Sequence, residues 1–153
     1  MNRFHNVIFG QKAFIINDAK EVLIIKRKNV DIFQGYWDVP GGKIEEGDSL
    51  FQGLAREIKE EVGLKLERII LCLSTSKFEG SMGDHPQIFR NIYLCRAEGK
   101  VLLSSEHEQY KWVKALDLAN YNFPEDNDFQ FALKNLVHIL AELNLDKSYS
   151  NLS

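Results

Sequence analysis

The stretch GKIEEGDSLFQGLAREIKEEVGL, residues 42–64, carries the clearest local structural signal in the chain. Ser49 and Gln52 have the spacing of a capping box at a helix N-terminus, and Gly63 stands where a C-terminal cap is expected. Apolar side chains recur every fourth residue between these caps, at Leu50, Leu54, Ile58 and Val62. The pattern predicts an amphipathic helix over residues 49–62 with its apolar stripe on a sheet or core.

Three glutamates on this helix need an explanation. Glu57, Glu60 and Glu61 fall within five positions, and residues three or four apart on a helix are neighbours. Like charges at that spacing cost roughly 0.2–0.5 kcal/mol per pair. Either solvent screens this repulsion, as on an ordinary exposed helix face, or a cation neutralises it.

A glycine-rich segment leads into the helix. FQGYWDVPGGKIEEGDS, residues 33–49, contains Pro40 and the glycines Gly35, Gly41, Gly42 and Gly47. It predicts a long shaped loop, because glycine permits backbone angles and close approaches that other residues do not. The turn at Gly41 and Gly42 either shapes the chain alone or also brings backbone N–H and C=O groups beside the acidic helix.

Five apolar runs and a second amphipathic segment indicate strands and another helix. KAFIIND (12–18) and EVLIIKRK (21–28) flank a polar turn, which predicts a β-hairpin. Further strands are expected at 66–78, 87–99 and 109–116, and a helix within 125–144.

Helices on two sides of one sheet would bury the apolar stripes of both helices. We therefore expect an α/β fold, an α/β/α sandwich with a mixed, mainly antiparallel β-sheet. Residues 1–145 are expected to form a single domain, followed by a polar tail at 146–153.

The composition indicates a folded protein and narrows its partners. Apolar residues make up 44% and charged residues 27% of the 153 residues, with a formal net charge of -3. This charge argues against a basic surface that binds a nucleic acid polymer. No apolar run approaches the roughly 20 residues that span a bilayer, so we expect a cytoplasmic protein without membrane association. Cys72 and Cys95 are too few for a disulfide framework, and their strand-like surroundings disfavour a nucleophilic role.

Residues 42–64 resemble the Nudix box, the signature of the Nudix hydrolase family. The box reads G, five residues, E, seven residues, then REUxEExGU, where U is aliphatic. Eight of its nine defined positions are matched over 23 residues, at Gly42, Arg56, Glu57, Ile58, Glu60, Glu61, Gly63 and Leu64. The first box glutamate is replaced by Asp48, a shorter carboxylate. WDVPGG, just before the box, also looks like the family's entry to it.

The resemblance implies a metal-dependent hydrolase. In the family the box carboxylates hold the metal, so the expected ligands are Glu57, Glu60 and Glu61, with the backbone of Gly41 beside them. Mg²⁺ or Mn²⁺ is the expected ion, because hard cations prefer carboxylate oxygens and water. Arg56 is expected to orient a catalytic glutamate, Glu57 or Glu60. The ordinary alternative for Arg56 is a surface ion pair with Glu60.

Three residues outside the box complete the candidate site. In several Nudix hydrolases a loop resembling SSEHEQYKWV supplies a further glutamate, and here Glu106, ahead of Glu108, would assist the metal or the attacking water. A polar loop without this role is the alternative, and the general base stays open. Arg27 is a candidate for a substrate phosphate and Trp37 for stacking on a base. A strand-end cation in solvent and an aromatic in a core are the commoner cases.

The expected substrate is a nucleoside diphosphate joined to another group, and the expected products are a nucleoside monophosphate and a phosphate-bearing remainder. STSKFEGSMGD, residues 74–84, lacks the proline or tyrosine typical of Nudix subfamilies that act on ADP-sugars or dinucleoside polyphosphates. This favours a (deoxy)nucleoside triphosphate. A nucleotide-sensing module without turnover and an isoprenoid diphosphate isomerase stay open as alternatives, and so does a homodimer.

Overall fold

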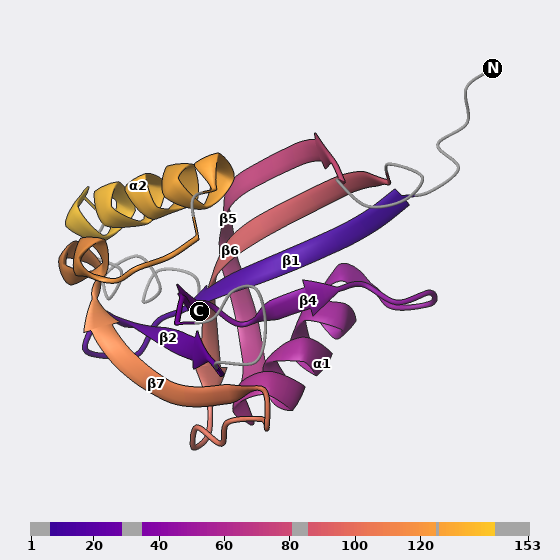
Figure 1. The fold of residues 1–153 in the computed structure, drawn as a ribbon. Coiled ribbons are helices and arrows are strands. Elements are labelled where there is room, and N and C mark those ends of the chain that lie inside the picture. Colours follow the sequence, from indigo (N-terminus) through magenta and orange to yellow (C-terminus); the bar gives the residue numbers. More distant parts are fainter. Residues whose placement is uncertain (1–6, 29–34, 81–85, 125, 143–153) are drawn as a thin grey trace, which may run out of the picture.

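The computed structural model describes residues 7–28, 35–80, 86–124 and 126–142. These ranges contain strands, two α-helices and a short 3-10 helix, η1 (Figure 1). The elements in chain order are β1 (Val7–Ile15), β2 (Glu21–Arg27), β3 (Trp37–Asp38), β4 (Gly41–Lys43), α1 (Leu50–Val62), β5 (Lys65–Glu79), β6 (Gln87–Glu98), β7 (His107–Lys114), η1 (Ala115–Asn120) and α2 (Asn127–Glu142).

The described strands form two sheets where the sequence analysis expected one. The larger sheet has the order β4-β1-β6-β5, in which β1 runs parallel to β6 and the other neighbours are antiparallel. The smaller sheet has the order β3-β2-β7 and is antiparallel throughout. The prediction of mixed, mainly antiparallel pairing is confirmed, whereas the prediction of a single sheet was wrong.

The predicted hairpin of β1 and β2 is also wrong beyond its turn. The turn itself forms, with the Asn17 N–H donating to the Glu21 carbonyl at 3.0 Å. After one bridge between Ile16 and Val22, however, the two strands separate into different sheets. Both strands are apolar on both faces, and each becomes a central strand with two other neighbours. Strand β1 lies between β4 and β6, and strand β2 lies between β3 and β7.

The helices cover opposite faces of the strands (Figure 1). Because successive strand residues point to opposite faces, Phe14 of β1 packs into the core that includes α2, and Ile15 packs into the core that includes α1. In β2, Ile24 faces the first core and Leu23 the second. The predicted α/β/α sandwich is confirmed.

Helix α1 begins and ends where its sequence signals predict. Ser49 Oγ accepts a hydrogen bond from the Gln52 backbone N–H at 3.1 Å, and Gln52 Oε1 accepts one from the Ser49 N–H at 3.0 Å. Gly63 adopts the left-handed conformation with φ 73°. The apolar stripe is buried from its second turn onward, at Leu54, Ile58 and Val62. Leu50, its predicted first member, is 48% exposed.

Helix α2 forms within the predicted 125–144 segment and is capped by Asp126. The Oδ1 atom of Asp126 accepts hydrogen bonds from the backbone N–H groups of Asp128 at 3.1 Å and Phe129 at 3.2 Å. The predicted tail at 146–153 lies outside the described residues.

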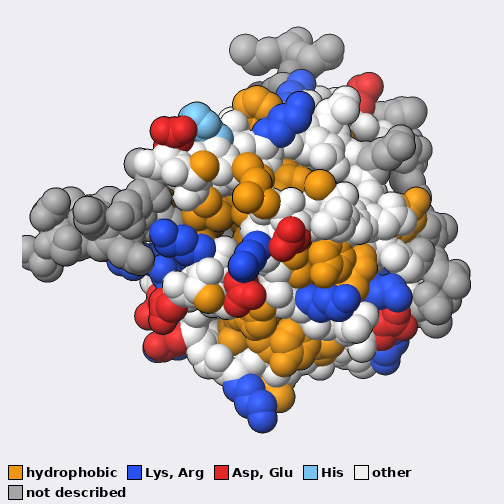
Figure 2. Space-filling model, turned by 90° about the vertical axis from the view of Figure 1, so that its left-hand side faces the viewer, with side chains coloured by type: hydrophobic (Ala, Val, Ile, Leu, Met, Phe, Trp, Pro, Cys, Tyr) orange, Lys and Arg blue, Asp and Glu red, His pale blue; other side chains and the backbone are white. Residues whose placement is uncertain are grey.

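On the side of the molecule where η1 lies, hydrophobic side chains appear among charged ones (Figure 2), and Leu116 of η1 is 79% exposed. Within the described ranges, no helix has the length and hydropathy to cross a membrane.

Candidate active site

Two glycines let β4 lie between β1 and α1. A Cβ atom on Gly41 would stand 2.1 Å from the Gln11 carbonyl oxygen, and one on Gly42 would stand 2.3 Å from Cδ of Glu57. Real Cβ atoms do not approach other atoms this closely, so a larger residue in place of Gly41 would displace the backbone of β1 or β4, and one in place of Gly42 would displace the Glu57 side chain. The glycines therefore do more than shape a turn, because they bring a bare backbone against the acidic side of α1.

Glu61 is the more deeply enclosed carboxylate of this contact. Its Oε2 accepts a hydrogen bond from the Gly41 N–H at 3.2 Å. Burial, reinforced by the negative charges of Glu57 and Asp38, raises the pKa of Glu61 to about 8, against the opposing effects of the Gly41 N–H and Lys12. The protein atoms alone thus favour the neutral acid at pH 7.

Glu57 lies beside Glu61, one helical turn earlier. Its side chain is 18% exposed and touches Gly42 on one side, while Arg56 Nη1 donates to Oε1 at 2.9 Å on the other. Burial raises the pKa of Glu57 even though Arg56 favours the ionised form. Two neighbouring carboxylates are therefore held in a setting that disfavours their negative charge.

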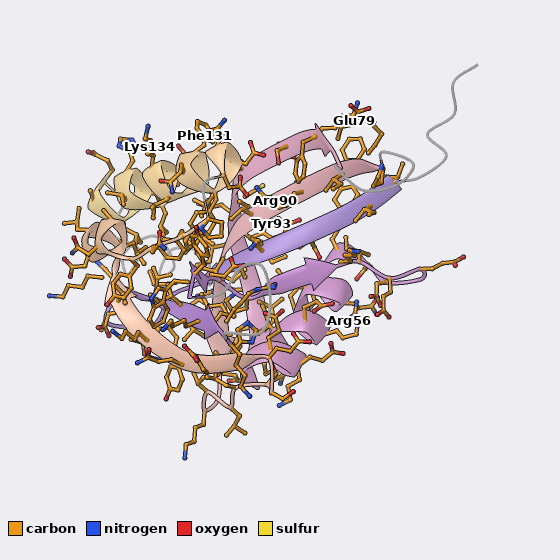
Figure 3. The ribbon with its side chains drawn as sticks, in the orientation of Figure 1. Arg56, Glu79, Arg90, Tyr93, Phe131 and Lys134 are labelled. Carbon is orange, nitrogen blue, oxygen red and sulfur yellow. The ribbon has the colours of Figure 1, made fainter. Side chains whose placement is uncertain are left out.

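Arg56 links the helix to the strand and loop before it (Figure 3). Besides Glu57, its guanidinium donates from Nη2 to Asp48 at 3.0 Å and to the Lys43 carbonyl at 3.2 Å. Its approach to Glu60 is only 3.9 Å. The sequence analysis offered a surface pair with Glu60 as the ordinary alternative, but the closer contacts are to Glu57 and Asp48. Asp48, the one departure from the box, thus serves as a second acceptor for Arg56.

Glu60 does not join the other two glutamates. Its side chain is 60% exposed, and it lies near Arg56 on the outer side of α1. Among the described residues, no group of three or more His, Cys, Asp or Glu side chains stands close enough to hold a metal ion. The structure therefore brings together Glu57 and Glu61 with Gly41, and leaves Glu60 apart.

Glu106 lies in a segment that packs against the end of α1. The Ser104 N–H donates to the Glu61 carbonyl at 2.9 Å, and the Glu106 carbonyl accepts from the Lys28 N–H at 3.1 Å. This contact places the loop next to the acidic face, although Glu106 lines neither of the cavities described below. Glu108, the alternative, is paired with Lys26 at 3.0 Å.

One cavity adjoins the glycines and the buried carboxylate, and a second, smaller cavity shares part of its wall. The larger, of about 430 Å³, is lined by Gly41, Gly42 and Glu61 together with apolar residues of β1 and β6. The smaller, of about 190 Å³, is lined in part by Trp37 and Asp126. The residues that line both cavities are Lys12, Arg27, Asp38 and Arg90. Of these four, the sequence analysis singled out Arg27 alone.

Trp37 is mainly a core residue. It is 8% exposed, and its ring meets Tyr121 edge-on with centroids 5.3 Å apart. Lys111 Nζ lies 5.3 Å from the Trp37 ring centroid. The structure thus gives Trp37 the core-closing role that the sequence analysis held as the alternative to base stacking, although part of the residue reaches the smaller cavity.

Arg90 and Asp126 join β6 to the start of α2 at the wall shared by the cavities. Arg90 contacts Asp126 through Nη1 and Nη2, each at 2.7 Å. Burial alone would raise the pKa of Asp126, but the Arg90 guanidinium and the two capping N–H groups hold it below its usual range. Figure 3 shows Arg90 on β6, on a different element from Arg56. The sequence signal that could have identified Lys12 and Arg90 as site residues is that each is an isolated charge within an apolar strand pattern.

The donor atoms of the site suit a hard divalent cation. Glu57 and Glu61 offer carboxylate oxygens beside the backbone of β4. Burial disfavours both as anions, and the negative charge of Glu57 adds to this effect at Glu61. A dication near such a pair would favour both ionised forms. The residues present therefore fit Mg²⁺ or Mn²⁺ by charge and by ligand type.

Comparisons with known proteins agree with the box. A family model described as the NUDIX domain matches residues 10–133. The chain is 31% identical over 142 residues to the 8-oxo-dGTP diphosphatase of Buchnera aphidicola subsp. Schizaphis graminum, covering 92% of this chain and 96% of that relative. It is 30% identical over 134 residues to the nucleoside triphosphatase NudI of Salmonella paratyphi B, covering 80% and 93%.

Solved structures share the fold. The MutT protein from Methanosarcina mazei Go1 matches with a TM-score of 0.71 at 26% identity, over 90% of this chain and 97% of that one. The E. coli ORF135 protein matches in fold with a TM-score of 0.74 at 21% identity, over 91% and 94%. Both the expected resemblance and the expected fold are confirmed, and the chain belongs to the Nudix family of hydrolases.

Proposed function

We propose that this Nudix hydrolase cleaves a nucleoside triphosphate in the presence of Mg²⁺ or Mn²⁺, giving a nucleoside monophosphate and diphosphate. The observation that carries the proposal is the pair of enclosed carboxylates, Glu57 and Glu61, held against bare β4 backbone, with Glu61 on the wall of the 430 Å³ cavity. The names of the relatives, a diphosphatase of 8-oxo-dGTP and a nucleoside triphosphatase, support a triphosphate substrate.

Nudix hydrolases generally use divalent metal cations, and we assign the ligands here to Glu57, Glu60, Glu61 and the Gly41 backbone. When bound, the cation would withdraw charge from the diphosphate and make a nearby water easier to deprotonate. Glu60 would leave its 3.9 Å approach to Arg56 to take part, which its 60% exposed side chain permits.

The chain's own groups orient the carboxylates and handle the proton. Arg56 holds Glu57, and the Gly41 N–H holds Glu61. In the reaction, the oxygen of a water molecule bonds to phosphorus while the bond to the departing diphosphate breaks. The water's proton passes to a carboxylate, for which Glu57, Glu60 and Glu106 are the candidates. The loop contact between Ser104 and Glu61 keeps Glu106 in this group.

Substrate contacts are assigned to the shared wall of the two cavities. Arg27 lines both of them, and its planar guanidinium suits a phosphate group. Trp37 contributes the edge of the smaller cavity, and base stacking on it has little support because 8% of the residue is exposed.

The two alternative functions, an isomerase and a sensor without turnover, are less well supported than hydrolysis. An isoprenoid diphosphate isomerase would need additional acid and base groups such as a cysteine in the pocket, yet neither Cys72 nor Cys95 lines either cavity. Burial raises the pKa of the Cys95 thiol to about 12. A sensor without turnover is disfavoured because the hydrolase relatives match over nearly the whole chain. The single domain, the cytoplasmic location, the lack of nucleic acid or membrane partners and a homodimer stay predictions.

Turnover of a nucleotide panel in ¹⁸O-labelled water tests the proposal. The purified protein with Mg²⁺ should release diphosphate from at least one nucleoside triphosphate, including 8-oxo-dGTP in the panel, and the label should appear in one of the two products. Glu61→Gln and Glu57→Gln should abolish this release. Release of single phosphates, or no turnover of any triphosphate with Mg²⁺ or Mn²⁺, would refute it.

A further inference from the structure

Lys12 of β1 stands where the two cavities meet. It lines both of them. In the ladder between β1 and β4 it lies opposite Gly41, whose N–H donates to Glu61. The side chain of Lys12 also lies close enough to influence the Glu61 carboxyl electrostatically. The strand partner of Lys12 is therefore the residue that hydrogen-bonds to the enclosed carboxylate. In the sequence, Lys12 lies 30 residues before the box that begins at Gly42.

Among the described residues, the ammonium group of Lys12 has one acceptor for its three N–H donors. Nζ contacts Asp38 Oδ1 at 2.5 Å, and the side chain is 24% exposed. In the part of the chain that the structure describes, Asp38 is its one hydrogen-bond acceptor. An ammonium group carries three N–H donors, so the described residues leave two of them without an acceptor. The same Asp38 oxygen accepts the Val39 N–H at 2.8 Å, which fixes the carboxylate that holds Lys12.

The other cations near this wall have different settings. Arg90 is bound through two nitrogens to Asp126 and also lies 5.4 Å from the centroid of the Phe78 ring, so it ties β6 to α2. Lys26, which is paired with Glu108, lines neither cavity. Lys12 differs from these residues in three ways. It lines both cavities, it lies opposite Gly41, the residue that donates to Glu61, and it has N–H donors that the described residues leave unused.

We propose that Lys12 binds a phosphate of the substrate's polyphosphate chain at the junction of the two cavities, with Asp38 positioning its ammonium group. This inference rests on the proposed function for the identity of the substrate. It adds a phosphate-binding residue that lies outside the box and lines the same two cavities as Arg27. A charged N–H donor facing a phosphate oxygen forms one of the stronger hydrogen bonds in proteins.

Binding of inorganic triphosphate, measured by titration calorimetry with Mg²⁺, tests Lys12 without depending on the nucleoside. Lys12→Met should weaken binding by about tenfold or more, and Lys12→Arg should retain most of the affinity. Lys26→Met is the matched control, because it also removes a strand lysine paired with a carboxylate, and it should bind as the wild type does. With a triphosphate substrate, Lys12→Met should raise KM far more than it lowers kcat.

A second pair of variants guards against a folding defect. Lys12→Met leaves Asp38 without its cation, so Asp38→Asn is compared with the double variant Lys12→Met/Asp38→Asn, which carries neither charge. The double variant should bind triphosphate at least about tenfold more weakly than Asp38→Asn. Equal binding within this pair, equal binding of Lys12→Met and Lys26→Met, or no triphosphate binding by the wild type would overturn the assignment. Lack of nucleotide turnover with intact, Lys12-dependent triphosphate binding would instead refute only the proposed function.

Discussion

Glu61→Gln should remove a pH dependence of folding stability that the enclosed carboxyl group creates. Burial raises the pKa of Glu61 from 4.5 to about 8. Between these pH values the unfolded chain has lost the proton, whereas the folded chain retains it. Since the folded state then binds more protons, its stability falls as the pH rises through this window. Gln does not titrate, and its Oε1 can still accept the hydrogen bond from Gly41.

The expected effect is large enough to measure. Each pH unit inside the window corresponds to about 1.4 kcal/mol. From about pH 5.5 to about pH 7.5, the free energy of unfolding of the wild type should fall by about 2–3 kcal/mol relative to that of Glu61→Gln. Mg²⁺ should reduce this fall, because a cation that favours the ionised carboxylate stabilises the folded wild type more than the variant.

Urea denaturation followed by tryptophan fluorescence, with a chelator present and then with Mg²⁺, measures the difference. In the series with the chelator, Glu60→Gln is the matched control, because that side chain is 60% exposed, and its free energy of unfolding should fall with pH as that of the wild type does. If the wild type and Glu61→Gln differed by the same free energy across the whole range, Glu61 would ionise as freely in the folded protein as in the unfolded one. The inference of an enclosed, charge-disfavouring site would then fail.

Three further substitutions address other contacts of the site. Gly42→Ala places a Cβ atom 2.3 Å from Cδ of Glu57, so kcat/KM should fall at least about tenfold. Gly47→Ala is the control, because a Cβ atom there meets no other atom within 4 Å, and it should lower stability while kcat/KM changes much less. An unchanged kcat/KM in Gly42→Ala would show that Glu57 can move without consequence. Arg56→Lys loses the planar fork that contacts Glu57 and Asp48, and steady-state kinetics should show kcat reduced about tenfold or more with little change in KM. Arg90→Met leaves Asp126 partly buried without its cation, and urea denaturation should show a loss of about 2–4 kcal/mol; a loss below about 0.5 kcal/mol would mark the pair as an ordinary surface contact.

Helix α1 could be predicted because its signals are local. The caps at Ser49, Gln52 and Gly63 act on the backbone of their own helix, so no distant partner has to be known. Strand partners are different. Phe14 and Ile15 show that β1 is apolar on both faces, and such a strand fits beside any apolar neighbour. The sequence therefore predicted where strands form but not that β1 would pair with β4 and β6 and leave β2 to another sheet.

The candidate site divides in the same way. Spacing alone made Glu57, Glu60 and Glu61 equivalent members of an acidic face. The position of β4 separates them, because it covers Glu57 and Glu61 and leaves Glu60 beside Arg56 in solvent. Lys12 and Asp38 were missed because they come from two strands that meet only in the folded chain.

The acidic helix can now be explained in terms of free energy. On a solvated face, neighbouring glutamates repel by roughly 0.2–0.5 kcal/mol per pair, which needs no compensation. Here β4, bare at Gly41 and Gly42, excludes solvent from two of them, and raising the pKa of Glu61 from 4.5 to about 8 corresponds to several kcal/mol against its ionised form. A cation beside the carboxylate would offset that cost. The fold thus places two carboxylates where their negative charge is disfavoured, at the point where Gly41 and Gly42 bring bare backbone against them.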